Sequence, residues 1–264
     1  MIINNKKMVV ARYSSKEMKL KNDYLQSFII NNKVDIIYNN EISIFELLLI
    51  VIYYKSLNAE VNLTLSYLPY QRMDHPNTNY TETIKYVASV FNSLHLNSLK
   101  ICEPHCDLDY FDNAQKICIV EKLFSKVTVE INFQKSNDLV IFTDKGSVKK
   151  YSRLNDNYAY GEKTRNPQTG LINSYKLIGN IKPKQKILIV DDIISSGDTI
   201  KEILECLSGC DNDVYILCAH LEKNKYNKRL VDNNQVKKIF ASNSLTKKQT
   251  KKIKLYDIKE ITYG

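Results

Sequence analysis

The segment Lys186–Ile200, which reads KILIVDDIISSGDTI, gives the strongest indication of the fold. Its first five residues, Lys186–Val190, form an apolar run of the length of a β-strand. Asp191 and Asp192 follow this strand, a small polar turn comes next, and an apolar-periodic helix begins near Ile200. The order of strand, acidic pair, turn and helix predicts a binding site at the carboxyl end of a strand in an α/β protein.

The residues of this turn suit a phosphorylated sugar. Backbone N–H groups of the turn Ser195–Thr199 and the positive end of the helix dipole can bind a phosphate. The two carboxylates can accept hydrogen bonds from ribose hydroxyls, directly or through a divalent cation. Gly197 lies where a bulky side chain would keep the backbone away from a phosphate. The alternative interpretation is an ordinary N-capped helix start, which the same residue types also produce.

The overall composition is that of a globular protein. The chain has 264 residues, enough for one large domain or two small ones. Its hydrophobic content of 44% and charged content of 25% are typical of globular domains, and no apolar run reaches the roughly 20 residues of a membrane span. The N-terminus lacks the apolar core of a signal peptide, so we expect a cytoplasmic protein with reduced cysteines and no membrane partner.

The net charge of +9 is spread along the chain, apart from a lysine-rich stretch between residues 247 and 254. A nucleic-acid interface would need a basic patch interleaved with aromatic residues, or a known binding module, and the sequence offers neither. We therefore expect small anionic substrates and no nucleic acid.

Apolar runs and helical periodicities alternate along the chain. Strands are expected at residues 61–67, 99–102, 139–142, 186–190 and 214–219, with short ones near 237–240 and 252–255, and helices at 44–54, 81–94 and 199–208. Strands that alternate with helices predict mainly parallel sheets covered on both faces, with binding sites at the carboxyl ends of the strands.

Four further polar segments belong to the same pattern. They are YLPYQRMD at Tyr67–Asp74, EPHCD at Glu103–Asp107, TDKGS at Thr143–Ser147, and EKTR at Glu162–Arg165 in a long polar loop. Together with Lys186–Ile200, these segments resemble the ribose-phosphate pyrophosphokinase family, also called phosphoribosyl pyrophosphate synthetases, in the same order and over nearly the whole chain. The acidic pair and its turn closely resemble the ribose-phosphate signature of the type I phosphoribosyltransferase fold.

This resemblance implies an α/β fold with two phosphoribosyltransferase-like domains, each a mainly parallel sheet flanked by helices. Residues 1–124 would form the ATP side, and residues 125–264 would carry the ribose-phosphate and diphosphate loops. Members of the family transfer the β,γ-diphosphate of ATP to the 1-hydroxyl of ribose 5-phosphate and release AMP. The short length of this chain is similar to that of bacteriophage members.

The resemblance also implies roles for residues of the C-terminal domain. The ribose-phosphate acceptor would be held by Asp191, Asp192, Ser195, Ser196, Gly197, Asp198 and Thr199. The transferring diphosphate would be held by Asp144, Lys145, Gly146 and Ser147. Lys163 and Arg165 would be the catalytic pair on a mobile loop, because their positive charge neutralises phosphoryl oxygens in the transition state.

In the N-terminal domain the resemblance implies ATP-binding residues, namely Arg72, Asp74, His105, Tyr13 and Glu17. Tyr13 and Glu17 match a segment that contacts adenine bound to a neighbouring subunit, so we expect a homo-oligomer with shared active sites. The implied cofactor is Mg²⁺, and the implied metal ligands are His105, Asp144 and Asp191.

The chain departs from the family at several positions. Met73 stands where the family has a glutamine, the turn after Asp192 reads Ser-Ser-Gly-Asp-Thr, and no final helix is expected after Ile258. The turn leaves two acceptors open: ribose 5-phosphate, which we favour, and ADP-ribose, which would link the chain to NAD salvage rather than to nucleotide biosynthesis. A phosphoribosyltransferase that consumes phosphoribosyl pyrophosphate and a non-catalytic regulatory homologue are the remaining alternatives. Intact Lys163 and Arg165 argue against the latter.

Overall fold

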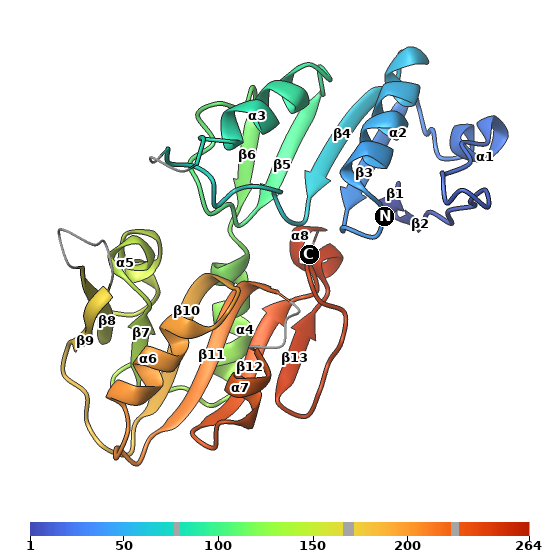
Figure 1. Ribbon diagram of the computed structural model, residues 1–264. Coiled ribbons are helices and arrows are strands. Elements are labelled where there is room, and N and C mark those ends of the chain that lie inside the picture. The colour runs from blue at the N-terminus through green and yellow to red at the C-terminus, as the bar shows by residue number, and fades with distance from the viewer. Residues whose placement is uncertain (77–79, 166–171, 223–226, 264) are drawn as a thin grey trace. The chain divides into compact units, whose positions relative to one another are not determined.

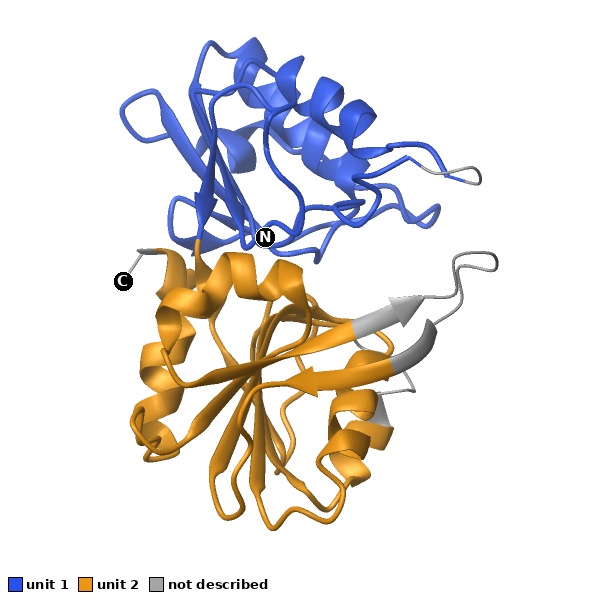
Figure 2. Ribbon diagram, turned by 90° about the vertical axis from the view of Figure 1, so that its left-hand side faces the viewer, with its two compact units in different colours: residues 1–117 blue, residues 118–264 orange. Residues whose placement is uncertain are grey.

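The structure is a computed structural model that describes residues 1–76, 80–165, 172–222 and 227–263. The chain divides into two compact units, residues 1–117 and 118–264, which Figure 2 colours separately. Each unit has its own sheet and its own apolar core. The predicted class, an α/β protein with two mainly parallel sheets flanked by helices, is confirmed.

Unit 1 contains a six-stranded sheet in the order β2-β1-β3-β4-β5-β6. Strands β3 to β6 are parallel, and β1 and β2 are antiparallel at one edge. The elements are β1 (Ile2–Ile3), β2 (Lys6–Lys7), α1 (Asn22–Gln26), β3 (Lys33–Tyr38), α2 (Ile44–Ser56), β4 (Glu60–Leu65), α3 (Ile84–Asn92), β5 (Ser98–Cys102) and β6 (Ala114–Ile117). Helix α2 begins with a capping box, in which Ser43 and Glu46 exchange side-chain to backbone hydrogen bonds at 2.9 and 3.2 Å.

Unit 2 contains a seven-stranded sheet in the order β13-β12-β11-β10-β7-β8-β9, parallel except for the β8–β9 hairpin. Its first elements are α4 (Ile119–Glu130), β7 (Leu139–Phe142), α5 (Lys145–Tyr151), a 3-10 turn (Ser152–Leu154), β8 (Tyr158–Arg165) and β9 (Ile172–Ile178). The rest are β10 (Lys186–Ile194), α6 (Asp198–Cys206), β11 (Asp213–Leu221), α7 (Asn227–Asp232), β12 (Val236–Ser242), β13 (Ile253–Tyr256) and α8 (Ile258–Tyr263).

The central strands of unit 2 are almost continuously apolar because helices cover both faces of the sheet. Figure 1 shows α4 behind the sheet and α6 and α7 in front of it. Residues 187–190 of β10 and 139–142 of β7 are fully buried, as expected for parallel strands covered on both sides. Among the described residues, no helix is both long and apolar enough to cross a membrane.

Four details of the sequence analysis require correction. The predicted boundary after residue 124 lies within α4, which packs against β11, so this helix belongs entirely to unit 2. Glu162–Arg165 was expected in a loop but belongs to β8, where it pairs with β9. Asp191 and Asp192 lie within β10 rather than after it. A final helix, α8, does follow Asp257.

An ion-pair network links the end of α4 to the strands at one edge of the sheet in unit 2. The Glu130 carboxylate accepts hydrogen bonds from Lys254 Nζ at 2.5 Å, Lys238 Nζ at 2.9 Å and the Tyr256 hydroxyl at 3.0 Å. Partial burial raises the pKa of Glu130, but these three donors outweigh it and lower the pKa to about 2. The network therefore favours the folded state most where Glu130 is ionised.

We predict that Glu130→Gln lowers the free energy of unfolding at pH 7 by on the order of 1 kcal/mol, because solvent screens this surface cluster. Because the pKa of Glu130 is lower in the folded than in the unfolded state, its ionised carboxylate stabilises the folded state above about pH 4.3. This stabilisation is lost as the pH falls toward the folded-state pKa. Urea unfolding of both proteins should therefore give a difference that shrinks below pH 4.5. Glu205→Gln, which removes one exposed i,i+4 pair with Lys201, is the control. A gap that is the same at pH 7 and pH 3 would contradict the prediction.

Candidate active site

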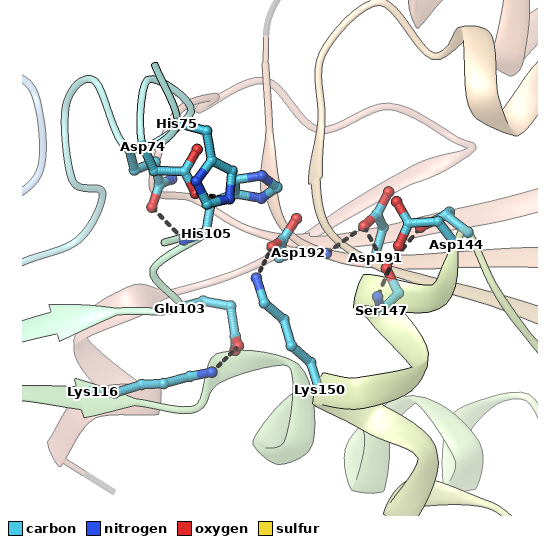
Figure 3. A network of polar contacts seen from close by, with 12 residues as sticks. Asp74, His75, Glu103, His105, Lys116, Asp144, Ser147, Lys150, Asp191 and Asp192 are labelled. Carbon is cyan, nitrogen blue, oxygen red and sulfur yellow. Dashed lines mark hydrogen bonds and ion pairs between the residues drawn. The ribbon is translucent and has the colours of Figure 1, made fainter. Parts of the chain in front are cut away.

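The carboxyl ends of β7 and β10 form the centre of the candidate site in unit 2. The pairing of β10 with β7 ends at Val190 and Phe142, whereas its pairing with β11 continues to Ile194 and Leu221. Beyond Val190, β10 therefore lies beside the start of α5 instead of a strand. Asp191 and Asp192 occupy this part of β10, so the acidic pair faces the loop that follows β7 (Figure 3).

Asp144 is the N-cap of α5. Its Oδ1 accepts a hydrogen bond from the backbone N–H of Ser147 at 2.8 Å, which satisfies one of the free donors of the first helical turn. A Cβ at Gly146 would lie 3.1 Å from Asp144 Oδ1, so glycine leaves space beside the capping carboxylate. The residues predicted to form the diphosphate loop, Asp144 to Ser147, thus form a tight helix start in which the first three residues are exposed and Ser147 is buried.

Ser147 connects the two predicted loops. Its hydroxyl lies 2.8 Å from the Thr143 hydroxyl and donates to Asp191 Oδ1 at 3.3 Å. Asp191 Oδ1 also accepts the backbone N–H of Asp192 at 2.9 Å. The acidic pair and the predicted diphosphate loop are therefore neighbours in one hydrogen-bond network (Figure 3).

Lys150 is a member of this cluster that the sequence analysis missed. Its Nζ donates to Asp192 Oδ2 at 2.5 Å, and the Asp192 side chain is only 6% exposed. The signal was present in the sequence, because Lys150 lies three residues after Ser147 on the same helix and so shares its face. The ion pair compensates the charge of the more buried carboxylate.

Asp144 and Asp191 have no such partner: in the described parts of the chain, no lysine or arginine forms an ion pair with either. Burial, followed by the charges of Asp192 and Asp144, raises the pKa of Asp191. This concentration of negative charge and hard oxygen donors suits Mg²⁺, which is usually held by one or two carboxylates together with substrate phosphates and water. No group of three or more His, Cys, Asp or Glu side chains among the described residues could hold a metal ion by itself. Asp144 and Asp191 therefore fit a cation that is shared with a bound substrate.

The predicted 5-phosphate turn, residues 195–199, leads into α6. Gly197 has φ of 77° and is the N-cap of this helix, and as a glycine it makes no side-chain capping hydrogen bond. At the start of the turn, the Ser195 hydroxyl donates to Glu222 Oε2 at 2.6 Å. Asp198 is exposed in the first turn of α6. The turn thus offers backbone donors and has two carboxylates close by, and the sequence analysis had not included Glu222.

A cavity of about 150 Å³ adjoins this turn. The turn contributes Ser196, Gly197 and Asp198, and α6 and α7 contribute Lys201, Leu204, Arg229, Leu230 and, just after α7, Asn233. The cavity therefore combines the exposed side of the turn with two cationic side chains.

The predicted catalytic pair lies on β8. The backbone of Lys163 pairs with that of Tyr175 in β9, and Arg165 pairs with Ile172. The side chains of Lys163 and Arg165 lie outside the described parts of the structure. On the same strand, Glu162 forms an ion pair with Lys145 at 2.5 Å, so β8 contacts the predicted diphosphate loop.

In unit 1, the predicted ATP-side residues follow β4 and β5. The backbone N–H of His105 donates to Gln71 Oε1 at 2.8 Å, which ties the segment after β5 to the segment after β4. Asp74 lies 3.9 Å from the His75 imidazole, and Arg72 is exposed. The structure thus brings His105 and the Arg72–Asp74 segment to the same edge of this sheet.

Tyr13 and Glu17 belong to a different part of unit 1. Both are exposed in a turn closed by a hydrogen bond from the Tyr13 N–H to the Glu17 carbonyl at 2.9 Å. The neighbouring Arg12 forms an ion pair with Glu46 in the first turn of α2. Tyr13 and Glu17 are thus exposed to solvent on a turn that the Arg12–Glu46 ion pair connects to α2.

Comparisons with known proteins agree with this architecture. The model of the phosphoribosyl transferase domain matches residues 156–257. The chain is similar to ribose-phosphate pyrophosphokinases of Sulfolobus acidocaldarius, with 28% identity over 76% of this chain and 70% of the relative, and of Saccharolobus solfataricus, with 29% identity over 62% and 58%. Its fold is similar to that of phosphoribosylpyrophosphate synthetase from Mycobacterium smegmatis, with a TM-score of 0.76 and 17% identity over 96% of this chain and 87% of that one.

These comparisons show a phosphoribosyl transferase domain in the C-terminal part of the chain, similarity in sequence to ribose-phosphate pyrophosphokinases over most of its length, and the two-domain fold of a phosphoribosylpyrophosphate synthetase.

Proposed function

We propose that the chain transfers the β,γ-diphosphate of ATP to the 1-hydroxyl of ribose 5-phosphate and so produces phosphoribosyl pyrophosphate and AMP. The observation that carries the proposal is the Ser147–Asp191 contact, which joins the Asp144–Ser147 loop to the acidic pair. One loop suits a diphosphate and the other suits ribose hydroxyls, so their adjacency supports transfer between the two groups.

In this proposal the acceptor binds along β10 and α6. Asp191 and Asp192 accept hydrogen bonds from the ribose hydroxyls, and the ion pair with Lys150 orients Asp192. The backbone N–H groups of residues 195–199 bind the 5-phosphate at the start of α6. The 1-hydroxyl is then directed toward the loop that begins at Asp144.

The transferring group binds at the Asp144–Ser147 loop. The oxygen of the 1-hydroxyl forms a bond to the β-phosphorus of ATP, the bond from that phosphorus to the α-phosphate oxygen breaks, the hydroxyl proton leaves, and AMP departs. Lys163 and Arg165 provide the positive charge that stabilises the phosphoryl oxygens. Mg²⁺ held by Asp144 and Asp191 would supply further charge neutralisation for the diphosphate.

Unit 1 supplies the nucleotide side in this proposal, through Arg72, Asp74 and His105, with His105 as a further metal ligand. Tyr13 and Glu17 are exposed on a turn closed by their backbone hydrogen bond. Their exposure supports a contact with adenine bound to a neighbouring subunit. We therefore propose a homo-oligomer with shared active sites.

The reaction is tested by its products. With ATP, Mg²⁺ and ribose 5-phosphate, we expect AMP and phosphoribosyl pyrophosphate in equal amounts, identified by mass, and no AMP without the acceptor. Release of ADP alone would overturn the proposal. Release of diphosphate from added phosphoribosyl pyrophosphate and a base would favour a phosphoribosyltransferase instead.

Lys163→Ala should lower kcat by on the order of 10³-fold, because a cation on the transition-state oxygens is lost. Circular dichroism and the melting temperature should remain those of the parent protein. Lys176→Ala, which removes an exposed lysine from the partner strand β9, is the matched control and should retain kcat within about two-fold. Equal kcat values for Lys163→Ala and the parent would exclude Lys163 from catalysis.

One observation favours ADP-ribose as a second acceptor. Its 5-phosphate is part of a diphosphate, so the next phosphate would lie beyond the turn, where the 150 Å³ cavity contains Lys201 and Arg229. The cavity is large enough for a phosphate but not for the rest of the nucleotide, which would extend toward solvent. Because the 1-hydroxyl of ADP-ribose is free, the same transfer would give its 1-diphosphate.

We predict that Arg229→Ala raises the KM for ADP-ribose by about 10-fold or more, the effect of losing one charge-assisted hydrogen bond. The KM for ribose 5-phosphate should stay within two-fold. Lys237→Ala, an exposed lysine paired with Asp213, is the control. Both acceptors should be assayed in parallel, and equal effects of Arg229→Ala on the two KM values would contradict a role for the cavity in acceptor choice.

A further inference from the structure

Tyr175 links the β8–β9 hairpin to the start of the diphosphate loop, in addition to the pairing of β8 with β7 and the Lys145–Glu162 ion pair. The hydroxyl of Tyr175, in β9, donates to the carbonyl oxygen of Thr143 at 3.0 Å. Thr143 immediately precedes Asp144, and its own hydroxyl contacts Ser147. This hydrogen bond therefore connects a strand of the hairpin to the backbone from which the diphosphate loop begins.

Gly161, in β8, leaves the space that this contact requires. A Cβ at position 161 would overlap the Tyr175 hydroxyl and lie 2.5 Å from the Thr143 carbonyl oxygen. Gly161 is not among the residues with positive φ, so glycine is required here for space and not for backbone conformation. Any larger residue would displace the Tyr175 ring or the Thr143 backbone.

The surroundings keep the Tyr175 hydroxyl protonated. Burial raises its pKa most, and the charges of Glu202, Asp144 and Asp191 raise it further. The hydroxyl is therefore a hydrogen-bond donor at neutral pH.

The register of the hairpin connects this anchor to the catalytic pair. Tyr175 lies opposite Lys163, and Gly161 lies opposite Leu177. The anchor thus acts on the residue pair that includes Lys163. Backbone hydrogen bonds hold β8 and β9 in register, so restraining Tyr175 also restrains the backbone of Lys163.

We propose that Tyr175 is a positioning residue, whose hydrogen bond to Thr143, in the space left by Gly161, holds the backbone of Lys163 at a set distance from the diphosphate loop. The role of Lys163 in this proposal rests on the proposed function. A shift of about 1 Å in a catalytic group can lower the rate on the order of 100-fold, so loss of the Tyr175–Thr143 hydrogen bond should lower the rate measurably.

The first test uses Tyr175→Phe, which keeps the ring and removes the donor. Tyr158→Phe is the matched control, because the Tyr158 ring packs on Phe142 and its hydroxyl makes no hydrogen bond to another described residue. In substrate-free protein, amide hydrogen exchange at residues 158–165 and 172–178 should become faster in Tyr175→Phe and remain unchanged in the control. Unchanged exchange in Tyr175→Phe would overturn the anchor whether or not the protein is a diphosphotransferase.

The second test is kinetic. Tyr175→Phe should lower kcat by about 10-fold to 100-fold, with the KM for the acceptor within two-fold, since the acceptor residues lie on β10 and α6. In a Lys163→Ala background, Tyr175→Phe should have no further effect on kcat, because the group that it positions is gone. The positioning role is rejected if the kcat losses of Tyr175→Phe and Lys163→Ala multiply in the double variant. It is also rejected if Tyr175→Phe alone leaves kcat unchanged. If the parent protein releases no AMP, the proposed function is rejected. The hydrogen-exchange experiment would then still test whether the Tyr175–Thr143 hydrogen bond holds the hairpin.

Discussion

The parallel pairing of β7 with β10 is the constraint on which the candidate site depends. It brings the carboxyl ends of two strands to one edge of the sheet, and the hydrogen bond from Ser147 to Asp191 joins the segments that follow. The ion pair of Lys150, the tyrosine anchor and the turn before α6 are all arranged around that edge. A shift in the register of β7 against β10 would therefore separate the Asp144–Ser147 loop from the acidic pair.

Charge is distributed unevenly within the acidic pair. Asp192 is balanced by Lys150, whereas the negative charges of Asp191 and Asp144 are close together and lack an ion-pair partner in the described chain. Such an arrangement raises the free energy of the empty site and lowers it when a divalent cation enters with the nucleotide. In the proposed function, Asp192 with its Lys150 partner would orient the acceptor, and Asp191 and Asp144 would hold the cation that enters with the nucleotide.

Local sequence patterns predicted the apolar strands, the helices α2 and α6, and the loops after β7 and β10, because these depend on residues close in the chain. They did not predict that β10 continues through Asp191, since this depends on how far β11 pairs beside it. Glu162–Arg165 shows no strand alternation and becomes a strand only through its pairing with β9. Tyr175 and Glu222 were missed for the same reason, because each contacts a partner that is remote in sequence, whereas the spacing of Lys150 from Ser147 could have indicated its place but not its partner Asp192. Side-chain partners across strands are set by topology, which a single sequence does not display.

The cavity beside α6 and α7 has a consequence for how this scaffold can diversify. In the proposed function, the residues that hold the sugar and the diphosphate follow β10 and β7, so the distance from C1 of the sugar to the diphosphate loop would be set by the pairing of these two strands. The far end of the acceptor would instead lie near the cavity formed by the turn before α6 and by side chains of α6 and α7, among them Lys201 and Arg229. New acceptors can therefore evolve through substitutions at this outer rim while the reactive geometry stays unchanged, which separates the evolution of substrate choice from that of catalysis.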